Sequence, residues 1–194
     1  MTTPPTSKPA PASRNEDLDA RITVQRQGRY WLLECEQTVA ASIDQLFPFF
    51  ADAYNLQQLT PSTLGFEVLT PKPIAMKPGA LIDYRLRVRG VPIKWRTEIE
   101  VWDPPHRFVD QQLKGPYERW HHTHTFTPTA DGGTLCKDRV EYRPAGGPLA
   151  PIVNKLIVQR DVVNIFKYRT VEIAKRFGRA RTNAPTRTGV SPAA

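Results

Sequence analysis

Histidines and large aromatic residues share one predicted strand near the middle of the chain. The segment from Gly115 to Phe126 reads GPYERWHHTHTF and holds three of the four histidines. With the two-residue period of a β-strand, one face of this segment carries Trp120, His122, His124 and Phe126. Titratable rings on the face that aromatic side chains mark as inward indicate a lined cavity rather than a solid core.

Acidic residues on the neighbouring strands can be placed relative to these histidines. The same alternation predicts that Asp110 on the preceding strand and Asp138 on the following strand point inward. A hairpin loop with an odd number of residues places the inward residues of its two strands opposite one another. If the loop between the histidine strand and the following strand comprises residues 130–132, His124 lies opposite Asp138. We therefore predict a contact between His124 and Asp138, with Asp110 near Trp120 and His122.

Three interpretations of these two imidazoles and two carboxylates remain open. In the first, the groups satisfy one another, because a buried carboxylate is costly unless it is paired. In the second, they recognise carbonyl or hydroxyl substituents of a ligand in a mostly apolar pocket. In the third, His122 or His124, oriented by Asp138 or Asp110, is the general base that acts on an acidic C–H or a phenol.

A metal ion or a nucleotide cofactor is not expected. His122 and His124 with Asp110 could form a set of two histidines and one carboxylate, but residues two apart on a strand diverge more than the usual helical or loop ligands. The sequence contains no glycine-rich dinucleotide motif, P-loop, nucleophile elbow or Cys-x-x-Cys pair. We therefore predict no metal site and no cofactor.

The histidine strand belongs to a predicted antiparallel meander. Residues 81–89 and 93–101 alternate between apolar and charged side chains, and a Gly-Val-Pro turn separates them. Short alternating segments joined by tight turns are typical of consecutive antiparallel strands. Seven strands are expected, at residues 30–39, 64–69, 81–89, 93–101 and 107–113, in the histidine strand after Pro116, and at residues 134–142.

Two short helices and one long helix complete the predicted order of elements. Ser42 and Gln45 have the spacing of a capping box, which opens a short helix over residues 43–50, and a second short helix covers residues 51–59. From Pro151 the sequence takes a helical period, and a helix of about 29 residues would be roughly 43 Å long. Its expected apolar face comprises Ile152, Leu156, Val163, Phe166, Ile173 and Phe177.

One domain over residues 20–178 is expected between disordered tails at residues 1–19 and 179–194, both rich in small residues and proline.

The net charge is +8, but the stretch from Lys167 to Ala194 holds seven basic residues and one acidic residue. A basic end on an almost neutral domain argues against a nucleic-acid partner. A module that presents this end to an acidic partner or an anionic membrane is a further candidate function.

The sequence also bears on location. No apolar run is long enough to span a bilayer, and residues 1–14 lack the apolar centre of a signal peptide. We therefore expect a cytoplasmic protein without stable membrane insertion. Cys35 and Cys136 lack metal-ligand spacing and are interpreted as reduced, packed thiols, and whether they ever pair stays open. The oligomeric state stays open.

Several motifs, together with the order of elements, carry a resemblance to a known superfamily. They are Phe47-Pro48-Phe49-Phe50-Ala51-Asp52-Ala53 with Asn55-Leu56 and Thr60-Pro61, then Pro78-Gly79, Trp95-Arg96-Thr97, Phe108-Val109-Asp110, Gly115-Pro116-Tyr117, Trp120 to Phe126, Asp138-Arg139-Val140 and Tyr168-Arg169. The chain resembles the START/Bet v 1-like (SRPBCC) superfamily, and within it the polyketide cyclase/dehydrase-like branch, from roughly Tyr30 to Phe177.

The resemblance implies an α+β helix-grip fold. In this fold a curved, seven-stranded antiparallel sheet wraps around a long C-terminal helix. A hydrophobic tunnel between sheet and helix binds lipids, sterols, quinones or polyketides in various relatives. It implies no reaction, because many such proteins only bind or carry ligands.

The predicted function is binding of a small hydrophobic, oxygen-bearing ligand, such as a lipid, a quinone or a polyketide, in an internal cavity. The alternative is a polyketide cyclase or dehydratase that uses a cavity His–Asp pair as general acid and base. The candidate catalytic residues are His122, His124, Asp110 and Asp138. The predicted ligand-binding residues are Tyr84, Trp95, Thr97, Phe108, Asp110, Gln112, Trp120, His122, His124, Phe126, Asp138, Tyr142, Phe166 and Arg169.

Overall fold

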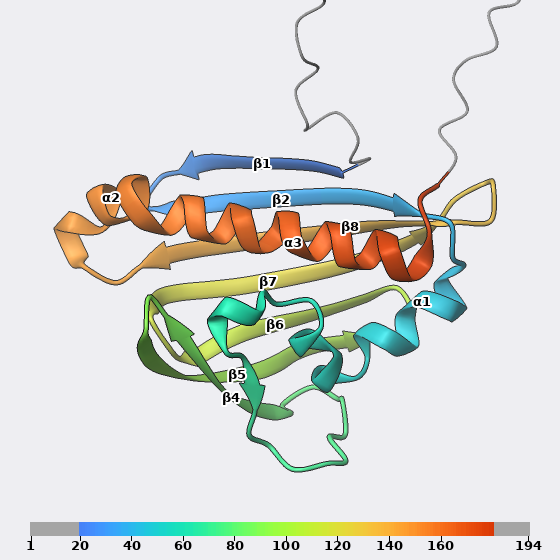
Figure 1. The fold of residues 1–194 in the computed structure, drawn as a ribbon, viewed down its shortest axis with the longest axis horizontal. Coiled ribbons are helices and arrows are strands. Elements are labelled where there is room, and N and C mark those ends of the chain that lie inside the picture. Colours follow the sequence, from blue (N-terminus) through green and yellow to red (C-terminus); the bar gives the residue numbers. More distant parts are fainter. Residues whose placement is uncertain (1–19, 181–194) are drawn as a thin grey trace, which may run out of the picture.

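One antiparallel sheet of eight strands curves around the long C-terminal helix (Figure 1). The computed structural model describes residues 20–180. The spatial order of the strands is β1-β2-β8-β7-β6-β5-β4-β3. The strands are β1 Ala20–Gln27, β2 Tyr30–Val39, β3 Glu67–Val68, β4 Leu81–Val88, β5 Val91–Asp103, β6 Arg107–Lys114, β7 Tyr117–Pro128 and β8 Thr134–Pro144. This arrangement confirms the predicted helix-grip α+β fold.

The strand β1 corrects the predicted number of strands. The sequence predicts seven strands, and residues 20–180 contain eight because β1 pairs along its length with β2, with Ala20 opposite Gln37. The large apolar side chains of β1 are Ile22 and Val24, and both are only half-buried at the edge of the sheet. An edge strand buries little apolar surface, so its alternation is weak in the sequence.

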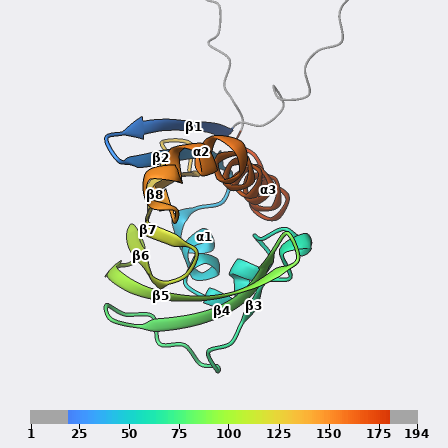
Figure 2. The same cartoon turned by 90° about the vertical axis from the view of Figure 1, so that its left-hand side faces the viewer.

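Short helices connect β2 to β3, and α1 lies within the curve of the sheet (Figure 2). They are α1 Ile43–Phe50, η1 Ala53–Gln57 and η2 Ser62–Leu64. The backbone N–H of Ser42 donates to the side-chain oxygen of Gln45 at 3.1 Å, as the predicted capping box requires. The second predicted helix, over residues 51–59, is instead a short 3-10 helix. Its tight first turn is fixed by Asp52, whose side chain accepts a hydrogen bond from the Tyr54 N–H at 2.9 Å.

The C-terminal helix contains a π-helical segment that changes which residues face inward. Its consecutive segments are η3 Gly147–Leu149, α2 Ala150–Val153, the π-helix η4 Asn154–Val158 and α3 Gln159–Phe177. A π-helical turn holds an extra residue, so the part before η4 is rotated relative to an unbroken α-helix. Two residues of the predicted apolar face, Ile152 and Leu156, are therefore 56% and 70% exposed. Phe166 and Ile173 of the same predicted face are buried.

The end of α3 is tied to the sheet. Gly178 has φ 74°, a conformation that favours glycine, and it ends the helix. Arg179 then forms a β-bridge with Val39. The predicted disordered tail over residues 179–194 is thus wrong for its first two residues. The remaining predicted tails, residues 1–19 and 181–194, lie outside the described residues.

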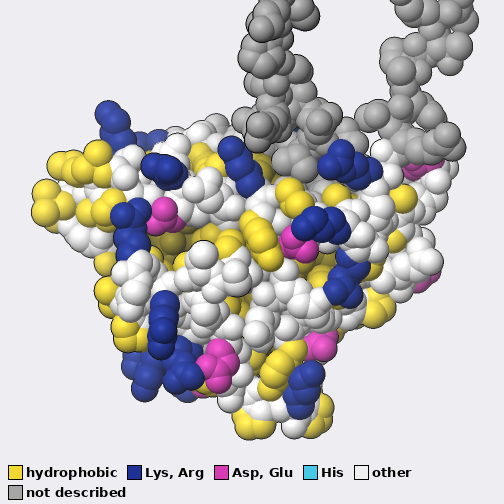
Figure 3. Space-filling model, viewed as in Figure 1, with side chains coloured by type: hydrophobic (Ala, Val, Ile, Leu, Met, Phe, Trp, Pro, Cys, Tyr) yellow, Lys and Arg dark blue, Asp and Glu magenta, His cyan; other side chains and the backbone are white. Residues whose placement is uncertain are grey.

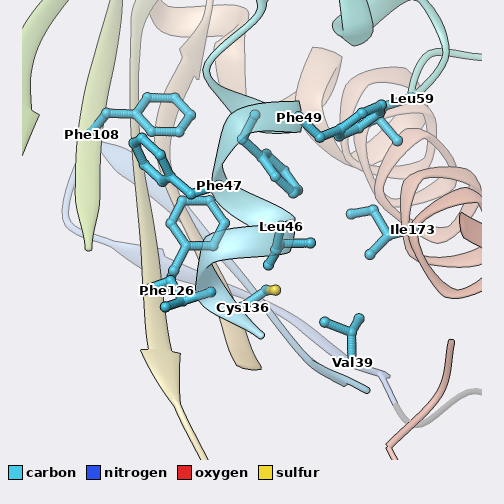
Figure 4. Packing of buried hydrophobic residues seen from close by; sticks show 11 residues of the cluster. Val39, Leu46, Phe47, Phe49, Leu59, Phe108, Phe126, Cys136 and Ile173 are labelled. Atoms are coloured by element: carbon cyan, nitrogen blue, oxygen red, sulfur yellow. The ribbon is translucent and has the colours of Figure 1, made fainter. Parts of the chain in front are cut away.

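A buried cluster under α1 joins the sheet to the C-terminal helix (Figure 4). Leu46 and Phe47 of α1 pack with Phe126 and Cys136 of the sheet, and Ile173 joins them from α3. The rings of Phe47 and Phe126 meet edge to face, with centroids 5.7 Å apart. Fully burying each large apolar side chain is worth about 1.5–3 kcal/mol. This cluster holds α1 and α3 in fixed positions against the sheet.

Among the described helices, none is long and apolar enough to cross a membrane.

Candidate functional site

A cavity of about 800 Å³ lies between the sheet, the short helices and the C-terminal helix. Its wall includes Tyr84 of β4, Trp95 of β5 and Phe166 of α3, and Phe50 of α1 and Leu59 of the turn after η1 cover it. Figure 3 shows apolar side chains within a hollow beneath the C-terminal helix. A volume of this size accommodates a lipid-sized or drug-sized molecule.

Four polar side chains from three neighbouring strands meet beside this cavity. Strand β7 lies between β6 and β8, and its register places Asp110 opposite His122 and Asp138 opposite His124. The loop between β7 and β8 has the odd length that this register requires, since Pro128 pairs with Thr134. The predicted pairing of His124 with Asp138 is confirmed. We call Asp110, His122, His124 and Asp138 the His–Asp cluster.

Each carboxylate of the His–Asp cluster contacts both imidazoles. Oδ1 of Asp138 lies 2.9 Å from Nε2 of His122 and 2.8 Å from Nδ1 of His124. Oδ2 of Asp110 lies 3.1 Å from Nε2 of His124 and 3.7 Å from Nδ1 of His122. The contact between Asp138 and Nδ1 of His124 is short, but its angle does not suit a hydrogen bond. The hydrogen bonds of the cluster therefore join Nε2 of His122 to Asp138 and Nε2 of His124 to Asp110. Because a carboxylate only accepts, each of these two nitrogens carries a proton.

Ring stacking fixes the two imidazoles further. His124 stacks on Phe108 with centroids 4.0 Å apart and planes 18° apart, and it also contacts His122 at 3.7 Å between centroids. Phe166 of α3 meets the His122 ring at 5.6 Å with its plane at 67°. Both histidines are buried. The rings therefore have little freedom to turn away from the carboxylates.

The pKa values of the two histidines shift in opposite directions. Burial, reinforced by the charge of His124, lowers the pKa of His122 to about 4. Burial also disfavours the charged form of His124, but its contacts with Asp110 and Asp138 outweigh burial and raise its pKa. At a pH between these two pKa values, His122 is neutral and His124 is the charged imidazolium.

The two carboxyl groups stay ionised although they are buried. Burial alone would raise the pKa of Asp110, but the hydrogen bond from His124 and the nearby positive charges lower it. Burial likewise opposes ionisation of Asp138, and the charge of Arg169 followed by the two histidines keeps its pKa well below the usual range. With His124 and Arg169 positive and both carboxylates negative, the group is neutral overall.

The same residues bear on whether a metal ion could bind. Among the described residues, Asp110, His122 and His124 offer ligand atoms that all lie within 4.8 Å of one another. Imidazole and carboxylate groups are suitable ligands for a transition metal. A cation at this position would have to replace the proton of His124 and would face the positive charge of Arg169, which acts on the cluster. The arrangement therefore favours a charge-balanced cluster over a metal site.

Most of the predicted ligand-binding residues line the cavity. Strand alternation and the helical period both contribute, because each distinguishes an inward face from an outward face. Ten of the fourteen border the cavity: Tyr84, Trp95, Thr97, Phe108, Asp110, Trp120, His122, His124, Phe166 and Arg169.

The other four predicted ligand-binding residues do not border it. The side-chain amide of Gln112 donates to the carbonyl of Tyr117 at 2.7 Å, which ties it to the turn between β6 and β7. Phe126 packs in the core under α1, and Tyr142 is fully buried in a second core cluster. Asp138 has its carboxylate against the two imidazoles. An inward direction predicts burial, and core and cavity residues share that property.

The predicted ligand-binding residues leave out the apolar cover of the cavity. It comes from the short helices and from the C-terminal helix, and it includes Phe49, Phe50, Leu56, Leu59, Ile157, Val158, Val162 and Ile165. A signal for the helical part was present, since Val158, Val162, Ile165, Phe166 and Arg169 recur at spacings of three and four. The expected face was placed differently because the π-helical segment shifts the helical phase.

A family model described as "Polyketide cyclase / dehydrase and lipid transport" matches residues 39–167. The chain belongs to this family. The match extends from the end of β2 into α3 and contains the whole His–Asp cluster. No curated protein sequence matches the chain.

Solved structures share the fold of this family member. Protein Ms6760 from Mycobacterium smegmatis has a TM-score of 0.58 and 20% identity, over 80% of this chain and 97% of that protein. Ginseng major latex-like protein 151 from Panax ginseng has a TM-score of 0.57 and 12% identity, over 77% of this chain and 99% of its own. A START superfamily protein from Mycobacterium smegmatis has a TM-score of 0.55 and 14% identity, over 75% of this chain and 96% of its own. These similarities confirm the START/Bet v 1-like fold.

Proposed function

We propose that the protein binds a small hydrophobic, oxygen-bearing ligand in the cavity and releases it unchanged. The observation that carries this proposal is the 800 Å³ cavity, whose mainly apolar wall includes Arg169 and members of the His–Asp cluster. Such a wall selects a molecule with an apolar body and a few oxygen atoms, for example a lipid, a quinone or a polyketide. The family description, which includes lipid transport, supports the same class of ligand.

The protonation of the His–Asp cluster favours binding over catalysis. A general base works best when its pKa lies near the operating pH, and the pKa of His122 is about 4. His124 has the higher pKa, but both of its ring nitrogens face carboxylate oxygens, which stabilise the proton that it already holds. Cyclase or dehydratase chemistry would need one of these rings to accept a proton from the substrate. That alternative is therefore less well supported.

Native mass spectrometry of the protein purified without denaturant tests the proposal. We expect a bound small molecule at up to one per chain, and denaturing extraction then identifies it. The variant Leu86→Trp places an indole in the cavity from β4 and should lose most of this molecule.

The matched control is Arg87→Trp, which adds the same ring on the exposed face of the same strand. It should keep the bound molecule. If both variants retained the molecule equally, its site would lie outside the cavity and the proposal would fail.

A further inference from the structure

We propose that Arg169 is the binding site for the carboxylate of an amphipathic ligand, so that the cavity takes an apolar acid in preference to a neutral apolar molecule. This inference rests on the proposed binding function and specifies the chemical class of the ligand.

Arg169 lies on the cavity wall within α3. Its side chain borders the cavity, and the residue is only 7% exposed. The guanidinium carbon lies 5.7 Å from the ring centroid of Phe50 and 5.8 Å from that of Phe166. Contacts of a guanidinium with aromatic rings are favourable, and these two rings come from different helices. They hold the charged group in place without using its hydrogen-bond donors.

The donors of Arg169 lack acceptors. Among residues 20–180, Arg169 forms no hydrogen bond and no ion pair, and its Nε is buried without a partner. A buried charged donor that is left unsatisfied is costly, so such groups in native proteins normally have a partner. An acceptor on a ligand in the cavity would supply the missing partner.

The neighbouring carboxylates do not take this role. Asp110 and Asp138 lie close enough for the charge of Arg169 to lower their pKa values, yet neither forms an ion pair with it. One oxygen of each, Oδ2 of Asp110 and Oδ1 of Asp138, already lies 2.8–3.7 Å from ring nitrogens of His122 and His124. Arg169 therefore balances the charge of the carboxylates from a distance, and its hydrogen-bond donors are available to an acceptor on a ligand.

A carboxylate matches this guanidinium better than a neutral oxygen does. Its two oxygens fit the planar fork of an arginine side chain and carry the compensating charge. An ester or a ketone offers a weaker, uncharged acceptor. The apolar part of the ligand would lie against the apolar side chains of the cavity wall, such as Leu86 and Ile99.

Isothermal titration calorimetry at pH 8 with dodecanoate, below its micelle-forming concentration, and methyl dodecanoate, below its solubility limit, tests the inference. The two molecules share their chain and differ in the charge of the head. The wild-type protein should bind dodecanoate at least about tenfold more tightly. Arg169→Met should bring this ratio close to one while it keeps affinity for the ester. Arg160→Met, which removes an exposed arginine of the same helix, should keep the wild-type ratio.

The outcomes separate this inference from the proposed function. Equal wild-type affinities for the acid and the ester would overturn the carboxylate site and leave cavity binding in place. A preference for the acid that survives in Arg169→Met would also overturn it. If the wild-type protein bound neither molecule, the proposed function would fail as well. Arg169→Lys keeps the charge and is the second variant if Arg169→Met does not fold. It should retain only part of the preference, and an undiminished preference in Arg169→Lys would count against the bidentate carboxylate site.

Discussion

Two imidazoles in contact, in different protonation states, are the central feature at the scale of single residues. His122 and His124 lie two positions apart on one strand, and each is hydrogen-bonded to a carboxylate from a different neighbouring strand. Two carboxylates close to two imidazoles in contact stabilise one added proton far more than a second. Together with Arg169, the cluster therefore resembles a charge-balanced structural group that also presents polar atoms to the cavity.

The lowered pKa of His122 predicts a specific sensitivity to acid. Its pKa is about 4 in the folded chain and ordinarily 6.5, so between these values the unfolded chain binds the additional proton. The free energy of unfolding should therefore fall as the pH drops from about 6.5 to about 4, by up to ~1.4 kcal/mol per pH unit from this residue. The variant His122→Gln should show a shallower fall in urea unfolding measured across this range.

Two other histidine variants complete the test. His124 has a raised pKa, so its stabilising contribution is full below pH 6.5 and is lost as the pH rises through that raised value. His124→Gln should therefore cost more stability at pH 5 than at pH 9. His106→Gln, in the turn between β5 and β6, should follow the wild-type curve. A His122→Gln curve that matches the wild-type slope would contradict the assigned protonation states.

The π-helical segment is the feature that matters most at the scale of elements. Buried residues lie on both sides of η4. Ala150 precedes η4 and Asn154 is its first residue, whereas Val162 and Phe166 follow it. The extra residue of a π-helical turn brings both sets onto the inner face, although an unbroken α-helix of the same sequence would not.

Single-residue deletions test the role of this segment. Deletion of the exposed Leu156 should convert η4 to regular α-helix and keep both buried faces, at a cost of about 1 kcal/mol or less. Deletion of the exposed Lys167 should rotate the following residues by about 100° and move Arg169 and Ile173 off the inner face, at a cost of several kcal/mol. Thermal unfolding followed by circular dichroism measures both. Equal melting temperatures for the two deletions would contradict this account of the helix.

The elements were predictable from sequence where their local signals are strong. Strand alternation and turn residues located β4 to β8, and the capping pair at Ser42 and Gln45 located the start of α1. The edge strand β1 and the phase of the C-terminal helix were missed. Both depend on contacts with distant residues, because β1 is stabilised mainly by pairing with β2 and the π-helical turn has no local sequence signal.

At the scale of the whole molecule, the sheet, the short helices and the C-terminal helix together enclose the proposed binding site. The sequence predicted which side chains of the central strands point inward, and it predicted the pairing of His124 with Asp138. It did not separate Tyr84, which lines the cavity, from Tyr142, which is packed in the core. A cavity is the volume that distant elements leave unfilled, whereas alternation along one strand reports only which face is buried.

Binding within this volume is the central claim, and methyl NMR during a titration with the neutral apolar probe 1-aminoanthracene tests it most directly. The predicted result is a saturable one-site shift of the methyl signals of cavity residues such as Leu86, Val158 and Val162, with little change at the core residues Val39 and Leu46. Saturable shifts confined to the exposed apolar residues Leu149, Ile152 and Leu156, or no saturable shift at all, would contradict it.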